Sequence, residues 1–183
     1  PWPRTLIAEL VQKLQQAGAV VVAFDVLLSE PDRMSPANIA QTLPQIDEAT
    51  RDRMRALPSN DEVLAAVMSK GRVVLGQAGI TKSAQVPPET GGLAFLGSDP
   101  TPFLFKFAGL LRNIPLLDQA AAGRGNLTQI PERDGVVRRV PLIVEAGGQK
   151  VPSLTMEILR VATGAGALLI QTDKNAGIQW VAI

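Results

Sequence analysis

Three acidic residues follow a run of apolar residues early in the chain. The segment AVVVAFDVLLSEPD places Asp25 near the end of the run, and Glu30 and Asp32 follow it closely. Carboxylates at this spacing can act as a general acid and base, hold a divalent cation or contact a polar ligand. The residues around them decide which of these roles is chemically possible.

Enzymatic roles for Asp25 conflict with its neighbours. A phosphatase that forms an aspartyl phosphate needs a second Asp two residues after the first, where this chain has Leu27. A phospho-receiver domain needs an upstream acidic pair to hold magnesium, and the opening segment PWPR contains no acid. The spacing of the three acids also matches no calcium loop. We predict no catalytic residue and no metal site.

A carboxylate at the end of a buried strand needs partners, because an unpaired buried charge costs several kcal/mol. We therefore expect Asp25 to accept hydrogen bonds from backbone N–H groups or to pair with an Arg. Contact with a ligand, and catalysis by an α/β hydrolase that uses Asp25, remain alternatives. Glu30 and Asp32 are expected on a solvated loop, where Glu30 is a second candidate for ligand contact.

Two adjacent arginines form a second candidate group. The segment DGVVRRVP reads as a strand, in which Arg138 and Arg139 point to opposite faces because side chains alternate. One guanidinium could therefore reach Asp25 and form a structural ion pair, since its fork matches a carboxylate. The alternative is that it binds an anion in a pocket.

Ser153 marks a third candidate. It precedes the helical pattern of LTMEILRVAT, so its hydroxyl is expected to cap that helix. The free backbone N–H groups of the same helix terminus could instead receive an anionic ligand. Both possibilities remain open from the residues alone.

Composition excludes several classes of function. The 183-residue chain has no Cys and no His, which removes thiolate and Ser-His-Asp catalysis, and most zinc and haem ligation. No cofactor is expected. The net charge is +1 and aromatic residues make up 4%, so the chain lacks the charge and stacking surfaces of a nucleic-acid-binding protein. No charge-free apolar run approaches the roughly 20 residues that span a bilayer.

The elements that would position these residues alternate in type. Apolar residues at three- and four-residue spacing predict a helix over 5–17, and continuous β-branched runs predict buried strands. Proline and glycine residues separate the remaining predicted helices and strands. The expected helices cover residues 5–17, three short segments between 35 and 70, 115–122 and 153–163, and the expected strands cover residues 19–26, 72–79, 125–130, 136–146 and the two ends of 167–183.

This order predicts an α/β fold: one three-layer sandwich over residues 1–183. Its sheet should be mixed and mostly parallel, with an antiparallel section near residues 125–146 around the turn at Asp134-Gly135. Residues 80–102 contain prolines and glycines at irregular positions, and are expected to form a long loop. That loop and the end of the strand at Asp25 are the expected walls of a pocket.

Several segments together resemble one family. They are PWPR, GAVVVAFDVLLSEPDRMSP, RDGVVRRVPLIVEAGGQKVPSLTMEILR and the trailing IQTD…GI. In order, distance and text they are similar to the second type of the cyclases/histidine-kinases-associated sensory extracellular (CHASE) domain. The similarity covers most of the chain and is least distinctive over residues 80–118.

The resemblance implies a bacterial sensor domain on the outer side of the cytoplasmic membrane, within a membrane-anchored parent chain. It further implies a small-molecule or protein signal, a homodimer, and a cytoplasmic nucleotide cyclase, histidine kinase or serine/threonine kinase as output. A module that binds no ligand and only sets the spacing of a dimer is the alternative.

Members of the family usually begin with an apolar strand that ends in an acidic pair, before the segment that corresponds to PWPR. This strand is expected to be absent here, and the last strand is expected to stop early. A sheet that lacks one strand exposes unpaired backbone groups. We therefore expect an uncovered sheet edge.

Overall fold

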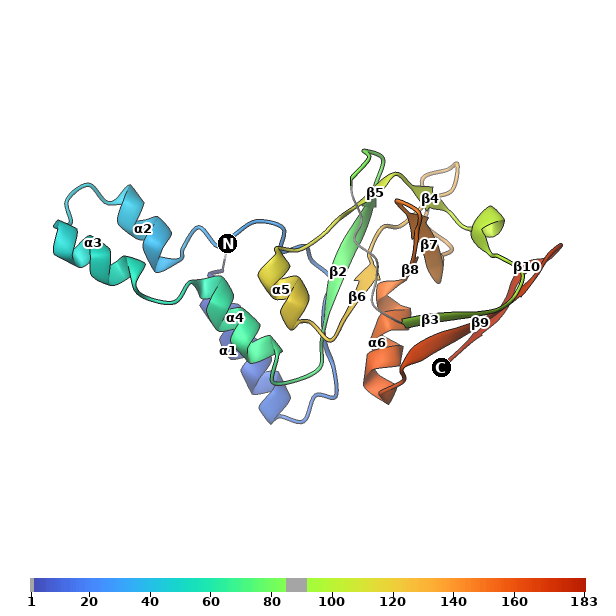
Figure 1. Cartoon of the computed structure of the whole chain (residues 1–183), viewed down its shortest axis with the longest axis horizontal. Helices are drawn as coiled ribbons and strands as arrows, with labels where there is room; N and C mark the ends of the chain where they lie inside the picture. The colour runs from blue at the N-terminus through green and yellow to red at the C-terminus, as the bar shows by residue number, and fades with distance from the viewer. Residues whose placement is uncertain (1, 85–91) are drawn as a thin grey trace.

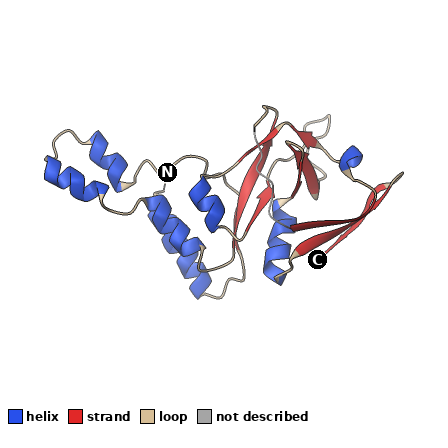
Figure 2. Cartoon of the chain, in the orientation of Figure 1, coloured by secondary structure: helices blue, strands red, loops and turns tan. Residues whose placement is uncertain are grey.

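The computed structural model describes residues 2–84 and 92–183 of the chain. The molecule is elongated, with most helices towards one end and most strands towards the other (Figures 1 and 2). The helices are α1 (Arg4–Gln16), α2 (Pro36–Thr42), α3 (Glu48–Arg55), α4 (Asn60–Met68), α5 (Pro115–Ala120), α6 (Leu154–Thr163) and the 3₁₀ turn η1 (Thr101–Phe103).

The strands form three small sheets. The first contains β1 (Val22–Phe24), β2 (Val73–Ile80), β5 (Gly109–Leu111) and β6 (Gly123–Asn126). The second contains β3 (Gly92–Gly97), β9 (Ala167–Asp173) and β10 (Gly177–Ala182). The third contains β4 (Lys106–Phe107), β7 (Ile143–Ala146) and β8 (Gln149–Pro152).

The first sheet is the centre of a three-layer arrangement. β2 pairs in parallel with β1 on one side and with β6 on the other, while the end of β2 pairs antiparallel with β5. One face packs against helices α1, α4 and α5 through the fully buried side chains of Val73 and Leu75. The opposite face packs against α6, because Gly123 and Gly125 leave room for it. The predicted α/β sandwich is therefore confirmed.

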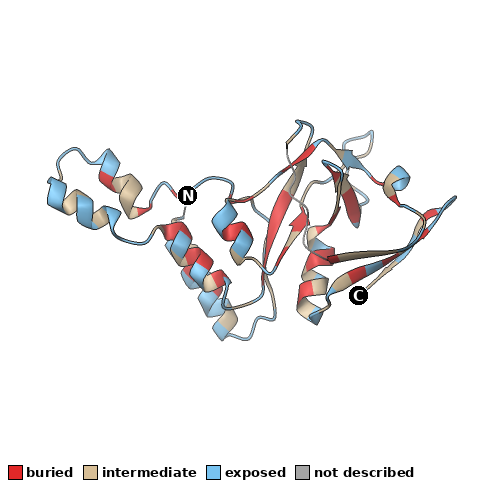
Figure 3. Cartoon of the chain, in the orientation of Figure 1, coloured by how far each residue is buried: buried red, intermediate tan, exposed pale blue. Residues whose placement is uncertain are grey.

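The core between the first sheet and its helices holds this half of the molecule together. Figure 3 shows the buried positions concentrated where α1, α4 and α5 meet the strands. Apolar side chains of this kind contribute about 1.5–3 kcal/mol each on burial. The buried members are Ala8, Val11, Leu28, Leu64, Ala65, Met68, Val73, Leu75 and Leu117.

Two smaller cores lie under the other sheets. Leu110 of the first sheet packs with Val144, Ala146 and Val151 of the third. Ile143, at the start of β7, packs with Ile170 in the middle of β9. Strand β7 therefore packs against the first sheet through Leu110 and against the second sheet through Ile170, and so links all three sheets.

A buried amide anchors the segment that follows β1. The side chain of Asn113 accepts a hydrogen bond from Leu28 N at 2.8 Å and donates one to Gly76 O at 2.9 Å. It also donates to Asp118 Oδ1 at 3.3 Å. These contacts hold the chain beyond β1 against β2.

Two expectations about strands are wrong. Residues 127–142 contain no strand, and β6 pairs in parallel with β2 instead of antiparallel with residues 136–146. The antiparallel partner of β7 is β8, across a turn at Gly147-Gly148 in which both residues have positive φ. Within the segment expected to be a loop, residues 92–97 form β3, which pairs in parallel with β9; residues 85–91 of that segment lie outside the described residues.

Strand β1 lies at the end of its sheet. Within residues 2–84 and 92–183 it pairs with β2 alone, so that its other edge carries no strand. The flanking side chains of Val20 and Val26 are exposed. The expectation that a missing first strand leaves a sheet edge open stays a prediction, and β1 is the edge at which it can be tested.

Candidate functional site

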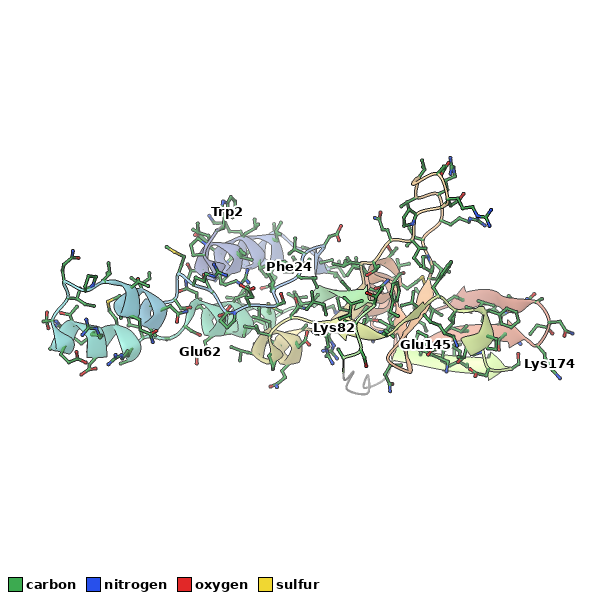
Figure 4. The ribbon with its side chains drawn as sticks, turned by 90° about the horizontal axis from the view of Figure 1, so that it is seen from above. Trp2, Phe24, Glu62, Lys82, Glu145 and Lys174 are labelled. Carbon is green, nitrogen blue, oxygen red and sulfur yellow. The ribbon has the colours of Figure 1, made fainter. Side chains whose placement is uncertain are left out.

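The segment 128–142, which we call the arginine loop, combines five charged side chains with a hollow surface. It runs between β6 and β7 and rises from the body of the molecule as the pale orange loop at the upper right of Figure 4. Pro131 and Pro141 cannot donate backbone hydrogen bonds to a neighbouring strand. Gly135, with φ +80°, makes the turn at its tip.

Ion pairs within the loop fix its shape. Arg138 donates two hydrogen bonds to Asp134, at 2.7 and 3.0 Å, and one to Glu132 at 3.3 Å. Arg139 donates from Nε and Nη2 to Glu132 Oε1, at 3.1 and 3.0 Å. The hydrogen bonds that Arg138 donates to Asp134 hold the pKa of the Asp134 carboxyl below its ordinary value, and the same bonds raise the pKa of the Arg138 guanidinium.

A cavity of about 740 Å³ opens beneath the loop. Its lining combines apolar and charged residues. The apolar residues are Phe105, Ile130, Pro131, Val140 and Pro141, and the charged residues are Glu132, Arg133, Asp134 and Arg139. The side chain of Arg133 forms no hydrogen bond or ion pair with any residue that the structure describes.

The structure therefore corrects the predicted role of the two arginines. Neither Arg138 nor Arg139 pairs with Asp25, because both lie on the projecting loop and use its own acids. Arg139 lines the cavity while its guanidinium pairs with Glu132, and the alternative that an arginine binds an anion there stays a prediction.

The prediction that Asp25 is a buried, paired carboxylate is wrong. Its side chain is exposed beside the uncovered edge of β1, and it makes no hydrogen bond or ion pair with the described residues. Strand β1 covers three residues and ends at Phe24, so Asp25 lies beyond the pairing with β2. An exposed carboxylate costs little, because water solvates it.

Asp32 has the buried role that was expected of Asp25. It is 9% exposed and accepts hydrogen bonds from Arg4 N at 2.7 Å, Asn60 Nδ2 at 2.8 Å and Met34 N at 2.9 Å. Its own backbone N–H donates to Asp61 at 2.8 Å. The expectation of a solvated Asp32 is therefore wrong.

The segment that contains Asp32 and Ser35 contacts the N-termini of two helices. The Asp32 carboxylate satisfies the first N–H of α1, where negative charge is favourable. Ser35 Oγ accepts from Asn60 N at the start of α4. The segment is thus a structural joint between α1 and α4.

Glu30 and Ser153 also have structural surroundings. Glu30 is exposed and pairs with Arg33 at 3.0 Å, as expected for a solvated loop. Ser153 is buried, and its hydroxyl caps α6 by accepting from Met156 N at 3.3 Å. The capping interpretation of Ser153 is confirmed.

This cavity is not the pocket that was predicted at Asp25 and residues 80–102, and residues 85–91 of that segment lie outside the described residues. Neither Asp25 nor any described residue of 80–102 lines the cavity. Arg133 was missed as a site residue, although it stands next to the turn signal Asp134-Gly135 in the sequence. The loop has three arginines and two acids, and this surplus of one arginine was the signal in the sequence that could have identified it.

The described residues contain no cluster of three side chains suited to a metal ion. In that part of the chain, no helix combines the length and the apolar character needed to cross a bilayer.

Comparison with known proteins gives one result. No curated protein and no solved structure matches the chain significantly. The model of the CHASE2 domain family matches residues 1–181, which is almost the whole chain. This family consists of sensory extracellular domains found in signalling receptors. The chain is therefore a member of the CHASE2 domain family.

Proposed function

We propose that this domain is the extracytoplasmic input module of a bacterial transmembrane receptor. Its membrane-anchored parent chain would pass a stimulus to a cytoplasmic nucleotide cyclase or protein kinase. The observation that carries the proposal is the family match over residues 1–181.

The connections of the arginine loop suggest how a stimulus would act. The loop leaves β6 of the first sheet and enters β7 of the third, so its two ends are attached to different sheets. A ligand held by the loop could favour one arrangement of these sheets over another. A stimulus must bind the two arrangements unequally, and a 5-fold difference corresponds to about 1 kcal/mol.

The proposal is tested with the parent receptor. Its coding sequence should contain apolar segments of membrane-spanning length and a cyclase or kinase domain. In membranes that contain the receptor, a small deletion within the arginine loop should change the stimulus dependence of output activity while leaving the catalytic domain intact. A parent chain without membrane-spanning segments would overturn the proposal.

The exposed face of α1 favours a second candidate function, a dimerisation module. Leu6, Leu10 and Leu14 lie at four-residue spacing and are 47%, 47% and 39% exposed. Glu9 and Lys13 flank this stripe and pair at 2.7 Å. Two copies of α1 packed antiparallel about a two-fold axis would bring each Glu9 near the Lys13 of the other copy.

We propose a second copy of this chain as the occupant of that face. Sedimentation velocity at increasing concentration should show a dimer, and Leu10→Glu should abolish it by placing a charge in the middle of the stripe. Leu116→Glu is a matched control, because Leu116 is similarly exposed on α5. A monomer at all concentrations, or equal effects of both substitutions, would contradict this assignment.

A further inference from the structure

We propose that the cavity beneath the arginine loop binds an amphipathic molecule with one negative charge. Its carboxylate or phosphate group would pair with Arg133, and its apolar part would lie against Phe105, Ile130 and Val140. The inference rests on the proposed sensory function in taking this molecule as the stimulus, and it adds the chemical class.

The balance of charges in the loop singles out Arg133. The loop contains the arginines at 133, 138 and 139 but the acids only at 132 and 134. Arg138 and Arg139 engage both acids. Arg133 keeps its donors free among the described residues, and it is one of the residues that line the cavity. A free guanidinium matches the two oxygens of a carboxylate or phosphate.

The acids on the same wall limit the charge of the ligand. Glu132 and Asp134 both line the cavity beside Arg133. A second negative charge on the ligand would approach these carboxylates and be repelled. The wall therefore favours a monoanion over a dianion or a polyanion.

The apolar wall explains why a simple anion would not suffice. An exposed ion pair contributes little to binding, because water and salt screen it. Phe105 and Val140 are each 53% exposed and offer apolar surface that an apolar chain would cover. A volume of about 740 Å³ lies within the roughly 300–1,000 Å³ of small-molecule sites.

Isothermal titration calorimetry of the 183-residue chain tests the proposal with monomeric decanoate as probe. We expect decanoate to bind, 1-decanol to bind at least 10-fold more weakly, and acetate and inorganic phosphate not to bind. Arg133→Gln should weaken decanoate binding at least 10-fold. Lys174→Gln makes the same charge change at the tip of the β9–β10 hairpin, outside the cavity lining, and should have no effect (Figure 4). Val140→Ser should also weaken binding, because it removes apolar surface from the wall.

A second arm separates the two sources of such an anion. Co-sedimentation with phosphatidylglycerol vesicles that is lost in Arg133→Gln would place the anion in a bilayer, whereas binding to decanoate without binding to vesicles would identify a free amphiphile. Either result supports the binding of an amphipathic anion by Arg133. Equal binding by wild type and Arg133→Gln, equal binding of decanoate and acetate, or no binding of either probe would overturn the proposal.

These outcomes are distinct from a failure of the proposed function. Absence of binding, together with an intact stimulus response in the parent receptor, would remove the ligand class and leave the sensory role. A parent chain that lacks membrane-spanning segments would remove the sensory role, while binding to the cavity could still be measured.

Discussion

Replacing Asp32 with alanine should destabilise the domain more than any other substitution among the acids of the AFDVLLSEPD segment. The Asp32 carboxylate accepts from Arg4 N, Asn60 Nδ2 and Met34 N. A buried donor left without an acceptor costs about 1–3 kcal/mol. Water will reach the two partly buried backbone donors, so we take about 1 kcal/mol for each of the three. Lost attraction to the start of α1 adds about 0.5 kcal/mol, and the expected loss in the free energy of unfolding is about 3–4 kcal/mol.

Urea denaturation followed by circular dichroism measures this loss. Asp25→Ala is the matched control: it removes the same side chain seven residues earlier, from an exposed position without hydrogen bonds to described residues. Its effect should lie within about 0.5 kcal/mol of zero. If Asp32→Ala costs less than about 1 kcal/mol, or no more than Asp25→Ala, the assignment of Asp32 as the joint between α1 and α4 is refuted.

The contribution of Asp32 should also depend on pH. Burial alone raises the pKa of its carboxyl, but the hydrogen bonds from Arg4, Asn60 and Met34 lower it more, and the net pKa lies below the ordinary value of 3.8. The stabilisation is therefore complete above the unfolded-state pKa and is lost as the pH falls through the folded-state pKa. The difference in unfolding free energy between wild type and Asp32→Asn should be constant near neutral pH and shrink below about pH 4.

Three further substitutions test other contacts. Asn113→Ala leaves three buried or partly buried partners unsatisfied and should cost about 2–4 kcal/mol in urea denaturation; a loss below 1 kcal/mol would show that water replaces the amide. Glu157→Gln removes the charge that faces the Arg160 guanidinium at 2.6 and 2.8 Å, and should lower the thermal midpoint by roughly 5–10 °C; an unchanged midpoint would contradict a buried ion pair. Gly125→Ala places a Cβ 2.4 Å from the backbone at the start of α6 and should cost about 2 kcal/mol or more, whereas a neutral effect would mean that α6 can move away.

The helices and turns whose bounds are marked by nearby residues could be predicted from the sequence. The apolar spacing of residues 5–17 predicts α1 to within one residue at each end, and Ser153 with Gly164 bounds α6 as expected. The turn before Gly177 separates β9 from β10 as expected. These signals are sufficient because a helical face, a cap and a tight turn depend on residues within a few positions of each other.

Long-range pairing explains the strands that were misjudged. β3 pairs with β9, which lies 75 residues further along the chain, and its glycine-bounded segment has no local strand pattern. The β-branched valines of residues 136–140 suggested a strand, but Pro141 and the ion pairs within the arginine loop hold these residues outside a sheet. A strand exists only where a partner supplies hydrogen bonds.

For the candidate site too, the sequence determined the types of group present and the tertiary structure determined their roles. Composition was enough to show that Cys and His chemistry is impossible, and residue types were enough to identify acids and arginines as the groups that could bind or pair. Their positions depended on packing. Asp32 is buried and Asp25 exposed because the starts of α1 and α4, distant in the chain, converge on the first of these carboxylates and not on the second. Burial and hydrogen bonding arise between segments far apart in sequence, so the folded chain sets the role of each charge.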